Sequence, residues 1–274
     1  MIDLHLHSHH SDGTWSPRDL VDHALKIGMK HIALTDHDTV AGVGEAIETA
    51  AGRLEIIPAV EINTIHHDEH GAYDVHILGY FIDIECPELV SVLDRQKAAR
   101  AAHVLDCIEL VSASGVAITL EDVQACAGKG AIGKAHLTEA IVRAGGAADL
   151  TAAYHKYMVR GSKYYAPRKS VAPVDAVRAI RAAGGIASMA HPGKEAHVIP
   201  LIEALIEAGL EGVEAYHRVH GLTLLRKYVR FAHKRNLLVT GGSDCHGPYE
   251  EFASMMGQIS LPPEILIALK KARR

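Results

Sequence analysis

The sequence predicts an α/β protein, a seven-stranded β/α barrel that carries an α-helical insertion. Short apolar segments alternate with amphipathic ones along most of the 274 residues, and this rhythm is typical of parallel β/α folds. Imidazole and carboxylate side chains follow one expected strand after another, and β/α barrels gather their chemistry at the carboxyl ends of their strands. The alternative is an open doubly wound sheet, which would converge its loops at a single switch point.

The first part of the chain alternates strands and helices in a regular order. Ser16 followed by Pro17 marks a helix start, because serine caps a helix and proline suits its first turn. Gly28 marks the end of that helix. We expect strands at 2–5, 31–35, 54–60 and 73–81, and helices at 16–27 and 43–51.

The pattern then becomes helical and stays helical to residue 158. We expect helices at 88–113, 120–127, 134–144 and 148–158, separated by glycine-rich breaks. The simplest interpretation is an insertion, residues 88–159, in a barrel formed by residues 1–87 and 160–274. We expect the insertion to cap the pocket of the barrel and to restrict it to short substrates.

The alternation of strands and helices resumes after a loop that ends at residue 172. This region supplies three further strands, which bring the expected number to seven. We expect helices at 173–183, 199–208, 222–234 and 263–272, and strands at 185–190, 211–215 and 237–240.

Composition bounds the environment and the partners of the protein. A net charge of −5 gives no basic nucleic-acid footprint at the level of the whole chain, although a metal cluster would supply its own positive charge to a nucleotide or a short oligonucleotide. The four cysteines form no C-x-x-C pair, which fits a reduced, cytoplasmic setting. The sequence also predicts no signal peptide and no membrane span, and it implies no protein partner.

Nine residues of metal-ligand type lie at or near the ends of the expected strands. His5 and His7 are two apart on a strand and therefore share one face, and Glu61 carries a carboxylate that can bridge two ions. Each residue alone has a simpler interpretation, such as a core histidine or a buried ion pair, but the combination favours a site for Mn, Fe or Zn. The nine are His5, His7, Asp12, His37, Glu61, His76, His191, Asp244 and His246.

Four further residues beside these candidates have chemistry of interest. Asp36 and Asp38 flank His37 and could orient imidazoles, as carboxylates commonly do around metals, with helix capping as the alternative. His217 and His220 follow the sixth expected strand, so we expect them at the mouth of the barrel, in contact with substrate.

The motifs, taken in order, resemble those of the PHP (polymerase and histidinol phosphatase) family. The resemblance covers nearly the whole chain, and its helical insertion is similar to that of the branch with 3′,5′-nucleoside bisphosphate phosphatases and 5′-to-3′ exonucleases of RNA or DNA. The motifs are H-x-H, S-D-G-T, T-D-H-D, the strand-end Glu61, H-x-L-G-Y, A-H-P-G and G-S-D-x-H.

This resemblance implies a distorted seven-stranded barrel that holds two or three divalent metals, often manganese. It implies one ion on His5, His7, Glu61 and Asp244, a second that shares Glu61 and adds His76 and His191, and a third on Asp12, His37 and His246. We expect Asp12, His37, His191 and His246 to be the catalytic residues, with His191 or His246 as a proton carrier.

The resemblance further places basic residues of the insertion near substrate phosphates. Arg100 and Lys134 match such positions, and Lys163 is a weaker match. The family commonly has arginine followed by proline or threonine where this chain has Lys134 and Ala135, and lysine cannot form the bidentate fork of arginine. Cys245 also replaces the usual aromatic residue of S-D-x-H. Both departures bear on substrate preference more than on metal binding.

The expected activity is hydrolysis of a phosphomonoester by metal-activated water. The expected substrate is the 3′-phosphate of a nucleoside 3′,5′-bisphosphate, with short oligonucleotides attacked from the 5′ end as an extension. The alternatives are a histidinol-phosphate or other small-molecule phosphatase, a hydrolase of amide or ring bonds, and a non-catalytic binding module that metals stabilise.

Overall fold

The computed structural model describes residues 1–69, 71–128, 132–159, 161–193, 198–248 and 255–273. They divide into two compact units. The barrel unit comprises residues 1–94 and 171–274, and the helical unit comprises residues 95–170.

Both limits of the helical unit lie later in the chain than the 88 and 159 expected from sequence. Helix α3 (Pro87–Ser112) runs through the first limit without a break. At the second limit, Tyr165 and Ala166 belong to the apolar core of the helical unit. A change of sequence pattern therefore marks where helices begin, whereas side-chain packing decides which unit a segment joins.

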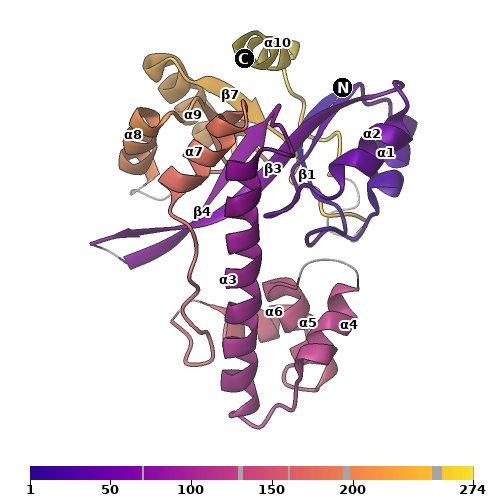
Figure 1. Ribbon diagram of the computed structural model, residues 1–274, viewed down its shortest axis with the longest axis vertical. Helices are drawn as coiled ribbons and strands as arrows, with labels where there is room; N and C mark the ends of the chain where they lie inside the picture. The colour runs from indigo at the N-terminus through magenta and orange to yellow at the C-terminus, as the bar shows by residue number, and fades with distance from the viewer. Residues whose placement is uncertain (70, 129–131, 160, 194–197, 249–254, 274) are drawn as a thin grey trace. The chain divides into compact units, whose positions relative to one another are not determined.

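The barrel unit is built on one seven-stranded sheet in which sequential strands are neighbours (Figure 1). The two edges of the sheet approach each other where the segment after β7 meets β1. There the main-chain N–H of His7 donates a hydrogen bond to the carbonyl of Cys245, and the N–H of Asp244 donates one to the carbonyl of His5. This partial closure is the distorted barrel that the sequence predicts. The strands are β1 (Ile2–Leu6), β2 (His31–Leu34), β3 (Glu55–Asp68), β4 (Gly71–Tyr80), β5 (Ile186–Met189), β6 (Gly212–Tyr216) and β7 (Leu238–Gly241).

One strand corrects the expectation of a parallel sheet. Strand β4 runs antiparallel to both β3 and β5, whereas the other neighbouring pairs are parallel. Only two residues separate β3 from β4 in the chain, and so short a connection permits antiparallel pairing only, because parallel strands need a longer crossover. The reversal explains why His76 lies within its strand: it pairs with Asn63 and is followed by Ile77, the partner of Met189 at the end of β5.

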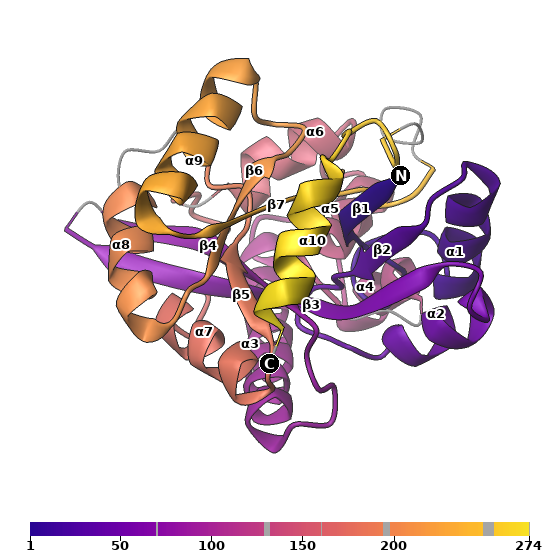
Figure 2. The ribbon, with the colours of Figure 1, turned by 90° about the horizontal axis from the view of Figure 1, so that it is seen from above.

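Helices cover the sheet in three groups, each over its own apolar cluster. Helices α1 and α2 lie over β1 and β2, and α7, α8 and α9 lie over β3 to β6, on opposite sides in Figure 2. Helix α10 packs Leu266 and Leu269 on a third cluster with residues of β1, β3 and β4. The bounds are α1 (Pro17–Lys26), α2 (Val43–Ala50), α7 (Pro173–Ala182), α8 (Val198–Ala208), α9 (Leu222–Arg235) and α10 (Pro263–Ala272).

Helix α1 begins where the sequence predicts, for the expected reason. The Ser16 hydroxyl accepts a hydrogen bond from the main-chain N–H of Asp19, and the Asp19 carboxylate accepts one from the N–H of Ser16. This capping box satisfies two donors that a helix start leaves without partners.

The described part of the helical unit holds helices and no strand, as the sequence predicts. After α3 come α4 (Leu120–Ala127), α5 (Lys134–Arg143), α6 (Leu150–Ala153) and a π-helical turn, η1 (Tyr154–Met158). Their apolar faces share a core that includes Val111, Leu137, Ile141 and Tyr157. Among the described residues, no helix of either unit combines the length and apolar character that crossing a membrane requires.

Candidate metal centre

Glu61 lies at the centre of the polar residues in the barrel unit. Its side chain is fully buried near the middle of β3, and imidazoles surround both of its oxygens. Oε1 lies 3.0 Å from His76 Nδ1 and 3.1 Å from His191 Nε2. Oε2 lies 3.2 Å from His5 Nε2, 3.3 Å from His7 Nε2 and 3.0 Å from His37 Nδ1. Each oxygen therefore faces its own set of imidazoles, which is the arrangement that a carboxylate bridging two ions requires.

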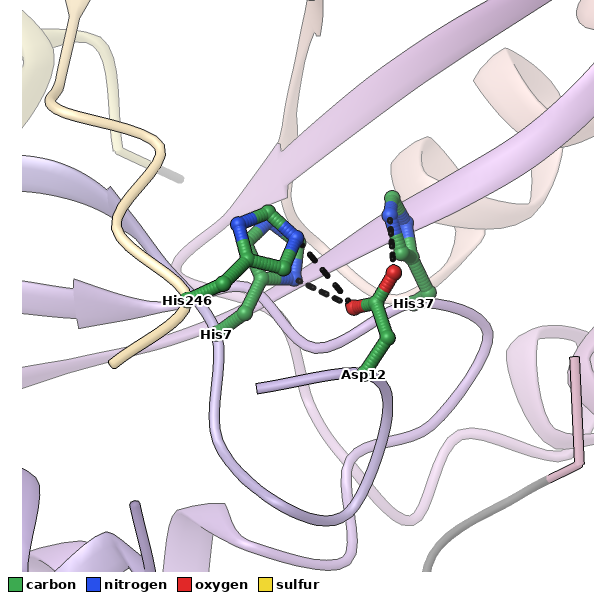
Figure 3. Close-up of side chains that lie close together, drawn as sticks. All are labelled: His7, Asp12, His37 and His246. Carbon is green, nitrogen blue, oxygen red and sulfur yellow. Dashed lines mark ion pairs between the residues drawn. The ribbon is translucent and has the colours of Figure 1, made fainter. Parts of the chain in front are cut away.

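A second group of side chains surrounds Asp12, which follows β1. Figure 3 shows His7, His37 and His246 converging on its carboxylate. Oδ1 of Asp12 lies 3.2 Å from His246 Nε2 and 3.9 Å from His7 Nδ1, and Oδ2 lies 3.7 Å from His37 Nε2. The ligand atoms of these four residues lie within 4.8 Å of one another, so one ion could contact all of them.

Asp244 completes the cluster from the segment after β7. Its Oδ1 lies 3.2 Å from His7 Nε2 and 3.5 Å from His5 Nε2, and its backbone φ is 55°. Positive φ is uncommon for a residue with a side chain, and such backbone often lies at functional sites. The structure thus brings all nine predicted ligands together, while their division among two or three ions stays a prediction.

Close main-chain packing holds the last segment against β1. An added Cβ on Gly242 would lie 2.4 Å from the main-chain nitrogen of His5, so only glycine fits at this distance. Beside it, Asp3 Oδ1 accepts hydrogen bonds from the main-chain N–H groups of His5 and Ser243. The spacing of Gly242 and Asp244 in the sequence therefore sets how near the Asp244 carboxylate comes to His5 on β1 and to His7 just after it.

Opposite charges dominate the electrostatics of the cluster. Burial alone would raise the pKa of Glu61, but the imidazoles of His37 and His5 hold it well below its usual value. Burial opposes charge on His7 too, yet the carboxylates of Asp244 and Glu61 raise the pKa of His7 to about 10. The negative charge that raises the pKa of His7 also attracts a divalent cation, which would displace the proton of that ring.

Several buried atoms of the cluster fit a metal better than they fit a hydrogen-bond network. Both ring nitrogens of His7 and Nδ1 of His37 have no hydrogen-bond partner among the described residues. Buried polar atoms without partners are costly and uncommon. Imidazole nitrogens and carboxylate oxygens together form a donor set for Mn, Fe or Zn, so the residues present fit the cofactor that the sequence predicts.

Asp36 and His220 both make hydrogen bonds that fix loops beside the cluster. Among the described residues, the Asp36 carboxylate accepts hydrogen bonds from the N–H and hydroxyl of Ser8 and from the hydroxyl of Ser11, and from no imidazole, so it holds the loop after β1. Both ring nitrogens of His220 bond main chain, with Nδ1 donating to Ala215 and Nε2 accepting from Gly193. They are therefore engaged in fixing the loop after β5, while contact of His220 with substrate stays a prediction.

The three basic residues predicted to contact phosphate all lie in the helical unit. The guanidinium of Arg100 lies beside Gly133, the residue that immediately precedes Lys134. The Lys134 ammonium lies 4.9 Å from the centre of the Tyr165 ring, and that of Lys163 lies 4.9 Å from the centre of the Tyr164 ring. Their contact with substrate stays a prediction.

Two residues at the cluster escaped the list of ligands drawn from the sequence. Glu214 on β6 is fully buried and bonds His5 and His191. His217, expected only as a substrate contact, lies with its Nε2 3.3 Å from Asp244 Oδ2. A signal for Glu214 existed, because it is the single acid of β6 and its neighbours on either side, Val213 and Ala215, are apolar.

Comparison with known proteins gives a consistent result. The PHP domain model matches residues 3–239. The chain is 32% identical over 268 residues to the 3′,5′-nucleoside bisphosphate phosphatase of Chromobacterium violaceum, covering 96% of this chain and 93% of that protein. It is 29% identical to the 5′-3′ exoribonuclease Rnm of Escherichia coli, covering 90% and 86%. A crystal structure from Bifidobacterium adolescentis, assigned as a metal-dependent phosphoesterase, superposes with a TM-score of 0.88 at 29% identity, covering 100% and 96%.

Proposed function

The chain belongs to the PHP domain family and is a metal-dependent phosphoesterase, and from that premise we propose that it hydrolyses the 3′-phosphate of a nucleoside 3′,5′-bisphosphate. The proposed cofactors are two or three divalent ions, with manganese preferred. Similarity over nearly the whole chain to the bisphosphate phosphatase of Chromobacterium violaceum supports this substrate.

The arrangement around Glu61 is the observation that carries the proposal. Five imidazole nitrogens lie within 3.3 Å of its two oxygens, which supports two ions sharing one carboxylate. When bound, such ions would lower the pKa of a water molecule and offset the charge on phosphate oxygens. The protein contributes by fixing the ligands in a largely buried frame, so that little reorganisation accompanies the reaction.

The exposed fractions of the ligand side chains support approach of the substrate from one side of the cluster. The side chains of His5, His7 and Glu61 are 0% exposed, whereas those of Asp12, His76, His191 and His246 are 23% to 28% exposed. The second set therefore lines the open side of the cluster. This supports Asp12, His191 and His246, together with the 11% exposed His37, as the groups nearest the reacting phosphate, with His191 and His246 as proton carriers.

Two cations of the helical unit support a substrate with a second phosphate. Arg100 lies beside Gly133, which precedes Lys134, and in this proposal both cations hold that phosphate through charge-assisted hydrogen bonds. Lys163 is the third proposed contact. In this proposal the helical unit selects bisphosphates over monophosphates, and the metal ligands perform the hydrolysis.

A second candidate is attack on short RNA or DNA from the 5′ end. Similarity to the Escherichia coli exoribonuclease supports it. The charge of the helical unit supports it too, because residues 95–170 carry 11 lysines and arginines against six acids, a net of +5. A basic surface attracts a phosphate backbone of any sequence.

Phosphate release from adenosine 3′,5′-bisphosphate by manganese-loaded protein tests the proposal. Histidinol phosphate, a 5′-phosphorylated short RNA and an amide substrate run in parallel, with Glu61→Gln as the inactive control. Release of one phosphate from the bisphosphate supports the proposal. Release from histidinol phosphate alone would replace the substrate, cleavage of the amide alone would replace the reaction class, and metal binding without any turnover would favour the non-catalytic module.

A further inference from the structure

Glu214 touches two of the proposed metal ligands at once. The side chain lies on β6 and is fully buried. Its Oε1 lies 3.0 Å from Nδ1 of His5. Its Oε2 accepts a hydrogen bond of 2.8 Å from the main-chain N–H of His191. Both carboxylate oxygens are thus used, and each is used on a residue of the cluster.

The bond to His5 decides which ring nitrogen faces the ions. A carboxylate only accepts hydrogen bonds, so Nδ1 of His5 must carry the proton in this contact. The remaining nitrogen, Nε2, lies 3.2 Å from Glu61 Oε2 and 3.5 Å from Asp244 Oδ1. Glu214 therefore leaves the lone pair of Nε2 for a metal and keeps the ring from rotating away from it.

The bond to His191 acts on the other side of Glu61. His191 has a backbone φ of 20°, a strained value that the surroundings must hold in place. Its Nε2 lies 3.1 Å from Glu61 Oε1, and its ring stacks on that of His5 at 5.7 Å between centres. One carboxylate thus holds a residue facing each of the two Glu61 oxygens.

We propose that Glu214 is a positioning residue that sets His5 and His191 on the two sides of Glu61, an inference that rests on the proposed metal site. A purely structural role would be different: a buried ion pair would stabilise the fold and leave metal affinity unchanged. The two roles therefore separate in measurements of metal binding by folded protein.

Two variants and a matched control test this inference. Glu214→Leu removes both acceptor oxygens, and Glu214→Gln keeps the size of the side chain with only one. Thr240→Val is the control, because Thr240 is the cross-strand partner of Glu214 in β7, is also fully buried, and bonds the hydroxyl of Ser188. The control reports the cost of removing a buried polar group from the same place in the sheet.

Calorimetric titration of manganese into folded, metal-free protein is the first readout. We expect Glu214→Leu to bind the tightest ion about 10- to 100-fold more weakly, Glu214→Gln to lose about tenfold or less, and Thr240→Val to match the wild type. If Glu214→Leu does not fold, the loss in Glu214→Gln relative to Thr240→Val decides. Unchanged affinity in the folded Glu214 variants would overturn the inference.

Histidine ring spectra of zinc-loaded, ¹⁵N-labelled protein give the second readout. We expect the ring N–H of His5 Nδ1 to be protected from solvent exchange in the wild type and to lose this protection in Glu214→Leu, whereas the ring N–H that His220 Nδ1 donates to Ala215 stays protected. A signal unchanged by Glu214→Leu would overturn the role assigned to the His5 bond. Wild-type protein that binds no metal would instead overturn the proposed function, so the two failures are distinguishable.

Discussion

The barrel unit and the helical unit differ in where they place charge. The barrel unit carries 17 lysines and arginines against 27 acids, a net of −10, whereas the helical unit has a net of +5. The barrel unit also buries carboxylates and imidazoles in one cluster, while the helical unit sets its cations beside tyrosine rings. One unit thus suits cations and the other suits anions, as a protein that joins metal ions to a phosphorylated substrate requires.

The largest expected effect is that of replacing Glu61, the carboxylate at the centre of the cluster in the barrel unit. Glu61→Gln removes the negative charge that five imidazoles surround. We expect kcat to fall by about 100- to 1,000-fold and bound metal to be lost. Turnover and metal content measured on the same preparation check this. Glu55→Gln on the same strand is the matched control, and a loss of equal size there would break the comparison.

Gly242→Ala tests whether main-chain packing, and not ligand identity alone, forms the cluster. The new Cβ would lie 2.4 Å from the main-chain nitrogen of His5, so β1 and the segment after β7 must move apart. We expect the free energy of unfolding to fall by about 1–3 kcal/mol and metal affinity to fall with it, as thermal melts and titrations will show.

Gly44→Ala is the control for that substitution. Gly44 lies in α2 and its added Cβ meets nothing within 4 Å. Alanine should there raise the stability by about 0.5–1 kcal/mol. A comparable loss of metal affinity in both variants would show that the closeness of β1 does not matter.

Substitutions in the helical unit should change substrate preference and spare the metals. We expect Arg100→Ala and Lys134→Ala each to lower kcat/KM for the bisphosphate by about 10- to 100-fold, the worth of a hydrogen bond to a charged group. Turnover of a nucleoside monophosphate and metal content should stay near wild type. Equal losses for both substrates would contradict a role in selecting bisphosphates.

Lys134→Arg tests the same role by strengthening the proposed phosphate contact instead of removing it. An arginine fork can bind a phosphate through two hydrogen bonds where lysine acts as a point charge. We expect kcat/KM for the bisphosphate to rise several-fold, measured beside Lys134→Ala. A decrease would indicate that the packing of Lys134 between Tyr154 and Tyr165 suits lysine alone.

The smallest expected effect lies on the surface of the barrel unit. Burial would raise the pKa of Glu55, but hydrogen bonds from Lys270 and His31 outweigh it and lower that pKa. A carboxyl group whose pKa is lower in the folded state than in the unfolded state stabilises the protein at pH values above the unfolded-state pKa. This stability is lost as the pH falls through the folded-state pKa.

Thermal melts of the wild type and Glu55→Gln over a pH series measure that contribution. The side chains are 31% to 41% exposed, so we expect at most about 0.5 kcal/mol at neutral pH, vanishing in acid. A difference that persists below the lowered pKa would exclude the ion pairs as its source.

The sequence by itself determined the features that depend on near neighbours. The capping box at Ser16 follows from a spacing of three residues, and His5 and His7 share a face because strand side chains alternate. The pattern of the helical insertion and the types of all nine candidate ligands were readable for the same reason. Periodicity and capping act within a few residues, so they leave a local trace.

Only the tertiary structure decided the features that depend on residues far apart in the chain. The direction of β4 placed His76 opposite Asn63 and near the end of β5, packing assigned Tyr165 to the helical unit, and main-chain bonds fixed the ring of His220. Glu214 meets His5 across 209 positions of sequence, and no local pattern states that this acid faces that ring. Such contacts form only when the sheet curls and brings its first and later strands together, because it is burial in the shared interior that obliges each polar group to find a partner.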